Sequence, residues 1–164
     1  MSESLNISKD DRLLLRLASI DDRDDLLNWR NNPRVVMFTR IQSTISAQEH
    51  NYWLTNRLTV LDTEPILIFT KGRNKVGMTR LDFIDSQERT YEISIVVDER
   101  YQNQGLGKSM LRRSCEFAMT ELSTTNIQAV IHKDNLSSIH LFCNLGFEIN
   151  SQEDDSFYVY RLES

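Results

Sequence analysis

The sequence feature that most constrains the fold is the glycine-containing loop Gln102–Gly107 (QNQGLG), which lies between two strongly patterned segments. Residues 90–98 before it alternate in polarity, and this period of two predicts a β-strand. After it, apolar residues recur at helical spacing over 105–122, which predicts an amphipathic helix. The first amides of a helix lack intrahelical partners and carry partial positive charge. The loop therefore predicts a site for a phosphate group.

Three kinds of phosphate-binding loop compete for this segment. A Walker A loop needs a glycine five positions before the G-K-S triplet at 107–109, but position 102 is Gln. A dinucleotide-binding fingerprint needs a third glycine at 110, which is Met. The pattern Gln/Arg-x-x-Gly-x-Gly/Ala is satisfied by Gln102, Gly105 and Gly107. A glycine turn that only begins a helix is the alternative without a ligand.

The rest of the chain predicts one α/β domain of the α+β type, with a mixed, mostly antiparallel sheet of about seven strands and about four helices. Residues 1–10 are expected to be a flexible N-terminal segment, and 11–164 the domain. The strands are predicted at 11–19, 65–71, 76–85, 90–98, 126–133, 147–152 and 156–164, and the helices at 20–33, 46–58, 105–122 and 135–146. Pro33 is expected to end the first helix, and Ser46 with Glu49 predicts a capping box at the second.

Composition argues against several classes of protein. The net charge of −5 over 164 residues, without a long basic run, argues against binding of nucleic acid. No segment has the ~20 consecutive apolar residues that span a bilayer, and the first residues are polar, so a cytoplasmic protein is expected. Cys115 and Cys143 have no metal-ligand spacing and sit in apolar patterns, which predicts no metal site and buried free thiols, with a disulfide as the alternative.

A second motif, Asn135 followed by SSIHLFCNLGF, ends in Gly146 and Phe147. Together with the QNQGLG loop and the order of elements, it resembles the GCN5-related N-acetyltransferases (GNAT superfamily). The resemblance implies acetyl-CoA as the acyl donor, with its pyrophosphate on the loop and its pantetheine arm paired with the strand before it. The residues implied to bind this cosubstrate are Ile95, Val96, Val97, Gln102, Asn103, Gln104, Gly105, Leu106, Gly107, Lys108, Ser109, Asn135 and Phe142.

Transfer of an acyl group to an amine needs a base, a stabilised oxyanion and a leaving thiolate. Glu92, on the strand at 90–98, is the first candidate base, with an arginine-paired surface glutamate as the alternative; His132 is the second candidate. The tyrosine that usually protonates the thiolate in this family is replaced by Phe142. Tyr158, Tyr160, Ser94 or a water are the remaining proton donors, and a domain that binds CoA without catalysis is a further alternative.

The acceptor is expected to bind the segment between the first and second strands. This segment resembles the acetyltransferases of UDP-linked 4-amino sugars, as in pseudaminic acid biosynthesis, and more distantly the ribosomal-protein N-terminal acetyltransferases. The predicted acceptor is therefore a small-molecule amine, with a nucleotide sugar first and a protein α-amine as the alternative; a homodimer is left open. The candidate acceptor-binding residues are Trp29, Arg30, Asn31, Met37, His50, Trp53 and Met78. Core packing is the competing role for the tryptophans and methionines.

Overall fold

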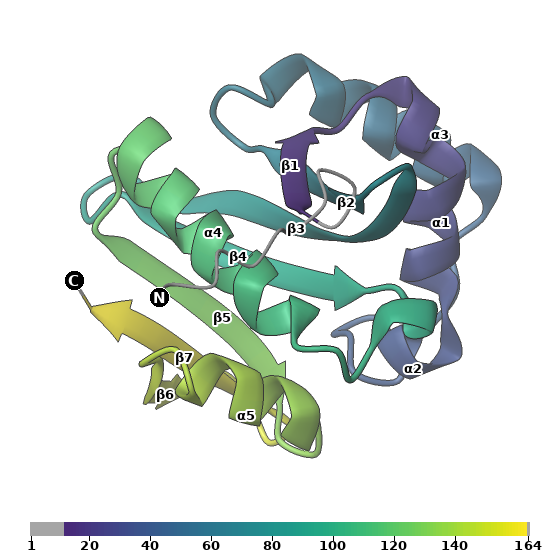
Figure 1. Cartoon of the computed structure of the whole chain (residues 1–164). Coiled ribbons are helices and arrows are strands. Elements are labelled where there is room, and N and C mark those ends of the chain that lie inside the picture. The colour runs from purple at the N-terminus through teal and green to yellow at the C-terminus, as the bar shows by residue number, and fades with distance from the viewer. Residues whose placement is uncertain (1–11, 164) are drawn as a thin grey trace, which may run out of the picture.

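A seven-stranded mixed sheet forms the centre of the computed structural model, which describes residues 12–163 (Figure 1). Its strands are β1 (Leu13–Leu17), β2 (Ile66–Lys71), β3 (Asn74–Asp85), β4 (Thr90–Val97), β5 (Asn126–His132), β6 (Glu148–Gln152) and β7 (Phe157–Glu163). The spatial order is β1-β2-β3-β4-β5-β7-β6, and every neighbouring pair is antiparallel except β4–β5. The predicted fold class is confirmed, whereas the predicted flexible segment 1–10 lies outside the described residues.

The described residues form five α-helices, one more than expected. They are α1 (Arg23–Asn31), α2 (Pro33–Val36), α3 (Ala47–Arg57), α4 (Leu106–Glu121) and α5 (Leu136–Cys143). Pro33 begins the short helix α2 instead of ending the helical region, and the side chain of Asn32 accepts a hydrogen bond from the amide of Arg34. Proline suits the first helical position, where its missing N–H costs nothing. The capping box predicted at α3 is present.

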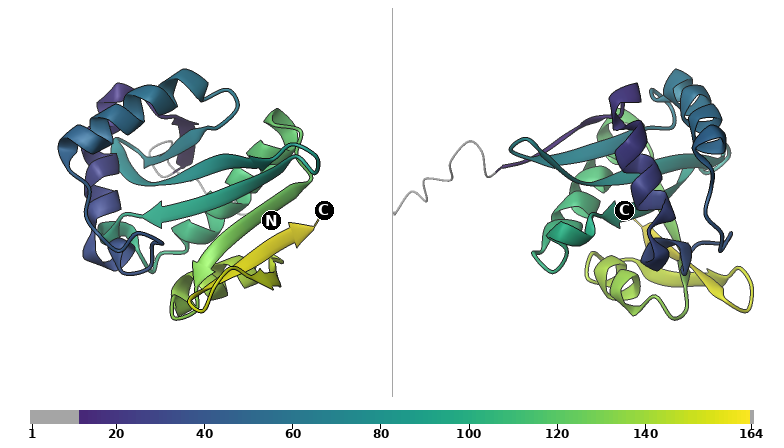
Figure 2. Two further views of the ribbon diagram at one scale, coloured as in Figure 1. Left: turned by 180° about the vertical axis from the view of Figure 1, so that it is seen from behind. Right: turned by 90° about the vertical axis from the view of Figure 1, so that its right-hand side faces the viewer.

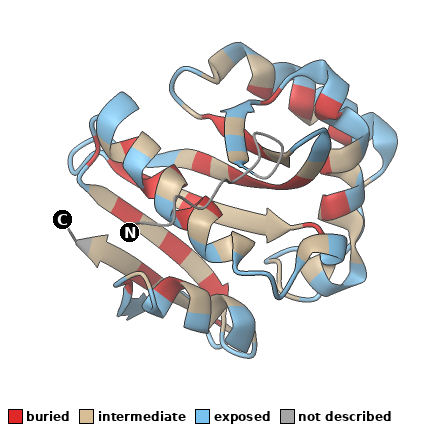
Figure 3. Cartoon of the chain, in the orientation of Figure 1, coloured by how far each residue is buried: buried red, intermediate tan, exposed pale blue. Residues whose placement is uncertain are grey.

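Helices cover both faces of the central part of the sheet, whereas every residue of β6 is exposed. Helices α4 and α5 pack on one side, and α1 and α3 on the other (Figures 1 and 2). β2 therefore contributes residues to both sides, which explains its continuous apolar sequence: Leu67 and Phe69 face α4, while Ile66 and Ile68 face the opposite core. Along β5, buried positions alternate with partly exposed ones, as Figure 3 shows in red and tan.

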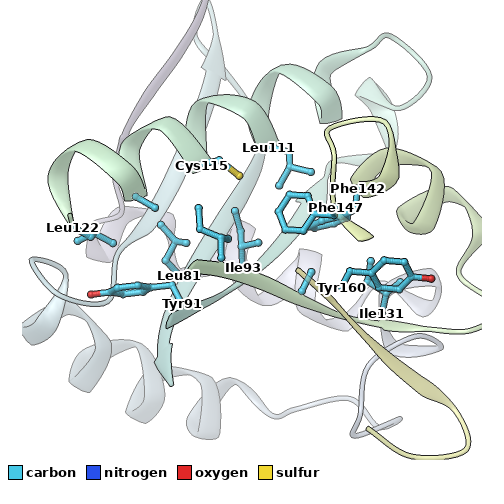
Figure 4. Close-up of a cluster of buried hydrophobic side chains, with 13 residues drawn as sticks. Leu81, Tyr91, Ile93, Leu111, Cys115, Leu122, Ile131, Phe142, Phe147 and Tyr160 are labelled. Carbon is cyan, nitrogen blue, oxygen red and sulfur yellow. The ribbon is translucent and has the colours of Figure 1, made fainter. Parts of the chain in front are cut away.

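The largest core cluster lies beneath α4 and α5 (Figure 4). Cys115 of α4 is buried in it, and burial raises the pKa of this thiol to about 12. Cys143 is exposed, so the prediction that both thiols are buried is wrong for this residue. It is the last residue of α5 and follows the buried Phe142. No helix among residues 12–163 combines the length and apolar character needed to cross a membrane.

The parallel pair β4–β5 is joined over three positions only. Thr90, Tyr91 and Glu92 pair with Asn126, Ile127 and Gln128, and beyond them the two strands diverge (Figure 1). β5 nevertheless stays paired with β7 along its whole length, up to His132. The result is a sheet that opens between its fourth and fifth strands, and the open end faces the loop that precedes α4.

Candidate active site

The diverging part of β4 presents main-chain groups to the opening. The amide of Asp98 donates to the carbonyl of Val76 in β3, 2.9 Å away. Because strand amides alternate in direction, the amides of Ile95 and Val97 point away from β3 and into the opening. An extended chain lying there can pair with β4 as an added strand would.

The loop after β4 ends in a helix N-terminus with no side-chain cap. Gly105 is the N-cap of α4 and has a left-handed backbone (φ 75°), and no side chain among residues 12–163 accepts a hydrogen bond at this end. Apart from its chain neighbours and the backbone of its own helix, a Cβ built on Gly105 would meet no atom of the described residues within 4 Å, so the space above the first turn is open to them. Asn103 also has a positive φ of 60°, and the Gln102 side chain donates to the carbonyl of Val97 at 3.1 Å. The first amides of α4 are therefore available to an anion, with the exposed Lys108 beside them.

A buried carboxylate fixes the start of this loop. Asp98 accepts hydrogen bonds from Trp29 Nε1 (2.9 Å) and from the amide and guanidinium of Arg100. The hydrogen bonds from Arg100 hold the pKa of Asp98 well below its usual range. Trp29 is itself buried, so the prediction that it contacts the acceptor is corrected. Its indole instead ties α1 to the start of the loop that precedes α4.

The far side of the opening is formed by α5. Asn135 caps this helix by accepting from the amide of Ser138 at 3.2 Å. Phe142 is only 3% exposed and packs edge-to-face on Phe147 in the core, as Figure 4 shows. The ring therefore supports the site from below and does not line it, contrary to expectation. The neighbouring Leu141 approaches Gly107 of α4, where any added Cβ would lie 3.4 Å from it.

Glu92 lies where the strands begin to diverge, on the face opposite the α4/α5 core. Both of its carboxylate oxygens accept from Arg40, at 2.9 and 3.2 Å. The same guanidinium binds Glu153 in the turn between β6 and β7. Ser94 follows on the same face of β4, opposite Arg80 of β3. The glutamate is thus arginine-paired, which is the role named as the alternative to a base.

His132 lies at the end of β5, between the rings of Phe38 and Phe157. Its Nδ1 accepts from the amide of Asp134 at 3.2 Å. In the neutral ring this hydrogen bond leaves the proton on Nε2. Tyr160, the most buried of the suggested proton donors, packs in the core, and burial raises its pKa.

Two more of the expected acceptor-binding residues belong to the core. His50 is 1% exposed and hydrogen-bonds the carbonyl of Arg23, and burial lowers its pKa. Met78 packs among the residues between β3 and α1. Both side chains are covered by neighbouring residues, so we exclude them from the acceptor site. Asn31 has a structural contact as well, because its amide group exchanges two hydrogen bonds with the backbone of Ile45.

The remaining three candidates leave surface for a ligand. Met37 is exposed, and Trp53 lies under the guanidinium of Arg80, 5.8 Å from the ring centre. Arg30 donates to the carbonyl of Ile41, but its buried Nη1 has no hydrogen-bond partner among the described residues. Burial and the neighbouring charge of Arg80 lower the pKa of Arg30.

Not every charged side chain near Glu92 and Arg30 has a partner of opposite charge. Glu92 and Glu153 share Arg40, Asp82 is paired with Arg57 and Arg80, and Glu64 is paired with Arg57. Arg30 forms no ion pair with a described carboxylate. Sequence reasoning did not find Arg40, Arg80 or Glu153, because no local motif marks them. Only the alternation of β3 against the strand at 90–98 could have indicated Arg80.

Comparison with known proteins identifies the family of the chain. A model of the acetyltransferase (GNAT) domain matches residues 12–148. An uncharacterised protein of Methanocaldococcus jannaschii is 26% identical over 160 residues, which are 95% of this chain and 32% of that protein. The spermidine N(1)-acetyltransferase of Escherichia coli K12 is 25% identical over 85 residues, 52% of this chain and 46% of the enzyme. The chain thus matches less than half the length of these two relatives.

Solved structures show the same fold. A domain from Methanocaldococcus jannaschii superposes with a TM-score of 0.81 at 21% identity, covering 93% of this chain and 99% of that one. The spermidine N-acetyltransferase of Vibrio cholerae, in complex with CoA and spermine, gives a TM-score of 0.77 at 19% identity, covering 91% and 92%. With the family model matching most of its length, the chain belongs to the GNAT acetyltransferase family.

Proposed function

We propose that this protein transfers the acetyl group of acetyl-CoA to a primary amine of a small molecule. One observation carries the proposal: the opening between β4 and β5 leads directly to a helix N-terminus that no side chain caps. The residues present suit the cosubstrate, since Gly105 leaves open space for a pyrophosphate and the amides of Ile95 and Val97 can pair with the pantetheine arm. These contacts position the thioester where the two strands separate.

The chain supplies each requirement of the reaction. The amine nitrogen forms a bond to the thioester carbon, the C–S bond breaks, and the amine loses a proton. An amide of β4 stabilises the oxyanion in the opening, which is worth several kcal/mol in a site that excludes water. Glu92 attracts the ammonium form and receives its proton, directly or through a water. Ser94 or a water passes a proton to the departing thiolate and takes one up from solvent in turn, because Phe142 lacks a hydroxyl.

The acceptor is proposed to carry an anionic group, as a nucleotide-linked amino sugar does. Arg30 and Arg80 lie close together on the surface that we propose binds the acceptor, which is called the acceptor face below. Arg30 has no described carboxylate to neutralise it. A phosphate can take both guanidinium groups, and Trp53 offers a ring for a base or sugar to stack on. The second candidate is a polyamine, which the names of the spermidine acetyltransferase relatives favour.

A free-thiol release assay with a panel of acceptors tests this proposal. We expect turnover with acetyl-CoA and UDP-linked 4-amino sugars, and kcat/KM at least about tenfold lower for spermidine, because Arg30 and Arg80 repel a polycation. Preference for spermidine or for peptides with a free α-amine would reject the anionic acceptor. Tight CoA binding without thiol release from any acceptor would reject catalysis.

Replacing Trp29 with Phe is expected to raise the KM for acetyl-CoA by about five- to tenfold and to leave the KM for the amine nearly unchanged. The change removes one hydrogen-bond donor to the buried Asp98. Loss of a hydrogen bond to a charged group costs ~1.5 kcal/mol or more, and here it destabilises the loop before α4. Steady-state kinetics with each substrate varied in turn measures the two KM values separately. Trp53→Phe is the matched variant, and it should raise the KM for the amine while leaving the KM for acetyl-CoA nearly unchanged. Equal effects on both KM values in Trp29→Phe would contradict the role given to the indole of Trp29.

A further inference from the structure

We propose that Arg40 determines acceptor specificity by occupying the pair of carboxylates, Glu92 and Glu153, that would otherwise bind a polycationic amine. This inference rests on the proposed function, because it requires the acceptor to approach β4 from the face on which Glu92 lies. It adds a residue to that function: the same fold would accept a polyamine if Arg40 were absent.

The contacts of Arg40 are those of a bound cation. Nη1 and Nη2 donate to the two oxygens of Glu92 at 2.9 and 3.2 Å, and Nε and Nη2 donate to Glu153 at 2.9 and 2.7 Å. Two carboxylates from β4 and from the β6–β7 turn thus converge on one guanidinium. Such a converging pair is the kind of site to which ammonium groups of a linear polyamine bind, and Arg40 already fills it.

The net charge of Arg40, Glu92 and Glu153 favours binding of a single ammonium group beside them. Two carboxylates and one guanidinium sum to −1, which suits one reacting amine near Glu92. Without Arg40 the sum is −2, which suits two neighbouring ammonium groups. The carboxylates are partly covered, with Glu92 16% and Glu153 35% exposed, so their attraction for a cation is only partly screened by water.

The backbone around Arg40 is held in place before any acceptor binds. Thr39 donates to the carbonyl of Ile41, Gln42 to that of Met37, and Arg30 also to Ile41. The Arg40 side chain is 47% exposed, yet its four hydrogen bonds and fixed backbone reduce the entropy lost when the guanidinium is positioned. It is therefore a built part of the acceptor face rather than a mobile surface arginine.

The test is the acceptor preference of Arg40→Gln, measured as the ratio of kcat/KM for spermidine to kcat/KM for a monoamine of similar length. We expect this ratio to rise at least about tenfold over that of the unmodified protein, because two carboxylates lose their cation. The rise in this ratio should be smaller at high salt, because salt screens the attraction between the carboxylates and spermidine. Adding Glu153→Gln to Arg40→Gln should remove most of the gain, since one carboxylate is then left.

The controls separate charge from structural damage. Arg73→Gln removes the same charge from the exposed turn between β2 and β3 and should leave the ratio unchanged. Arg40→Lys keeps a cation but not the forked geometry, so it should give a small rise. An unchanged ratio in Arg40→Gln with the fold intact, or an equal rise in Arg73→Gln, would overturn the role of Arg40.

Failure of the proposed function has a different signature. If no acceptor releases thiol from the unmodified protein, catalysis is rejected, and calorimetry of spermidine binding to the CoA-loaded protein then tests Arg40 alone. Binding that appears or tightens at least about tenfold in Arg40→Gln supports the proposal, and equal binding in both proteins overturns it.

Discussion

Replacing Gly105 with Trp should weaken CoA binding about 100-fold or more while leaving the fold intact. The built Cβ at this position meets nothing within 4 Å, so an indole can be accommodated by the protein alone. It would occupy the space that the pyrophosphate needs beside the first amides of α4. Loss of two charge-assisted hydrogen bonds, each worth ~1.5–3 kcal/mol, accounts for a factor of this size. Isothermal titration calorimetry with CoA measures it directly.

Gly105→Ala is the matched control for backbone strain. Gly105 has φ 75°, and any other residue there costs about 1 kcal/mol, so both variants should lose similar stability. Alanine should weaken CoA binding by about tenfold at most, since only its methyl group approaches the ligand. Equal affinity of Gly105→Trp and the unmodified protein would show that the pyrophosphate does not bind at this helix.

Replacing Asp22 with Asn should lower the free energy of unfolding by about 2–4 kcal/mol, the cost of removing one partner from a buried ion pair. Asp22 is fully buried and accepts from Arg16 at 2.7 and 2.8 Å, from Lys75 at 2.8 Å and from the amide of Ser19 at 2.9 Å. An asparagine amide would turn an N–H toward these donors. Urea unfolding at pH 7 measures the loss. Asp25→Asn, whose more exposed carboxylate binds Lys75 alone, is the control and should cost less than about 1 kcal/mol.

The Asp22 carboxylate also makes the free energy of unfolding depend on pH. Burial acts to raise the pKa of Asp22, but the hydrogen bonds from Arg16, Lys75 and Ser19 outweigh it and hold the pKa well below its usual range. A group whose pKa is lower in the folded state stabilises the fold above its unfolded value, near ~3.9, and loses this contribution as pH falls toward the folded value. Stability should therefore decline below about pH 5, and less steeply in Asp22→Asn. Parallel declines in the two proteins would contradict this assignment.

The elements with strong local patterns were predictable from the sequence. The alternation at 90–98 and the helical spacing after Gly105 gave β4 and α4 nearly their observed bounds, because side-chain periodicity is a property of each segment alone. The short helix at Pro33 was missed because proline marks both the end and the first turn of helices. The exposure of Cys143 was missed because a run of apolar residues does not by itself reveal which of them face the core.

The acceptor face was the least predictable part. Trp29 and His50 have the residue types of a ligand site, yet the tertiary structure buries both. Arg40 binds carboxylates 52 and 113 residues away, so no local motif could reveal the cluster. Its residues become neighbours only when the α2–α3 segment and the β6–β7 turn fold over β4.

The sequence by itself determined the corner that we propose binds the phosphate, since a strand, a glycine loop and a helix N-terminus are consecutive in the chain and their chemistry is local. Only the tertiary structure decided that β4 and β5 separate after Glu92, and which charges on the acceptor face are left without a partner. The physical reason is that strand register and ion pairing depend on contacts between distant segments. Those contacts form only when the whole sheet and the helices on both of its faces pack together.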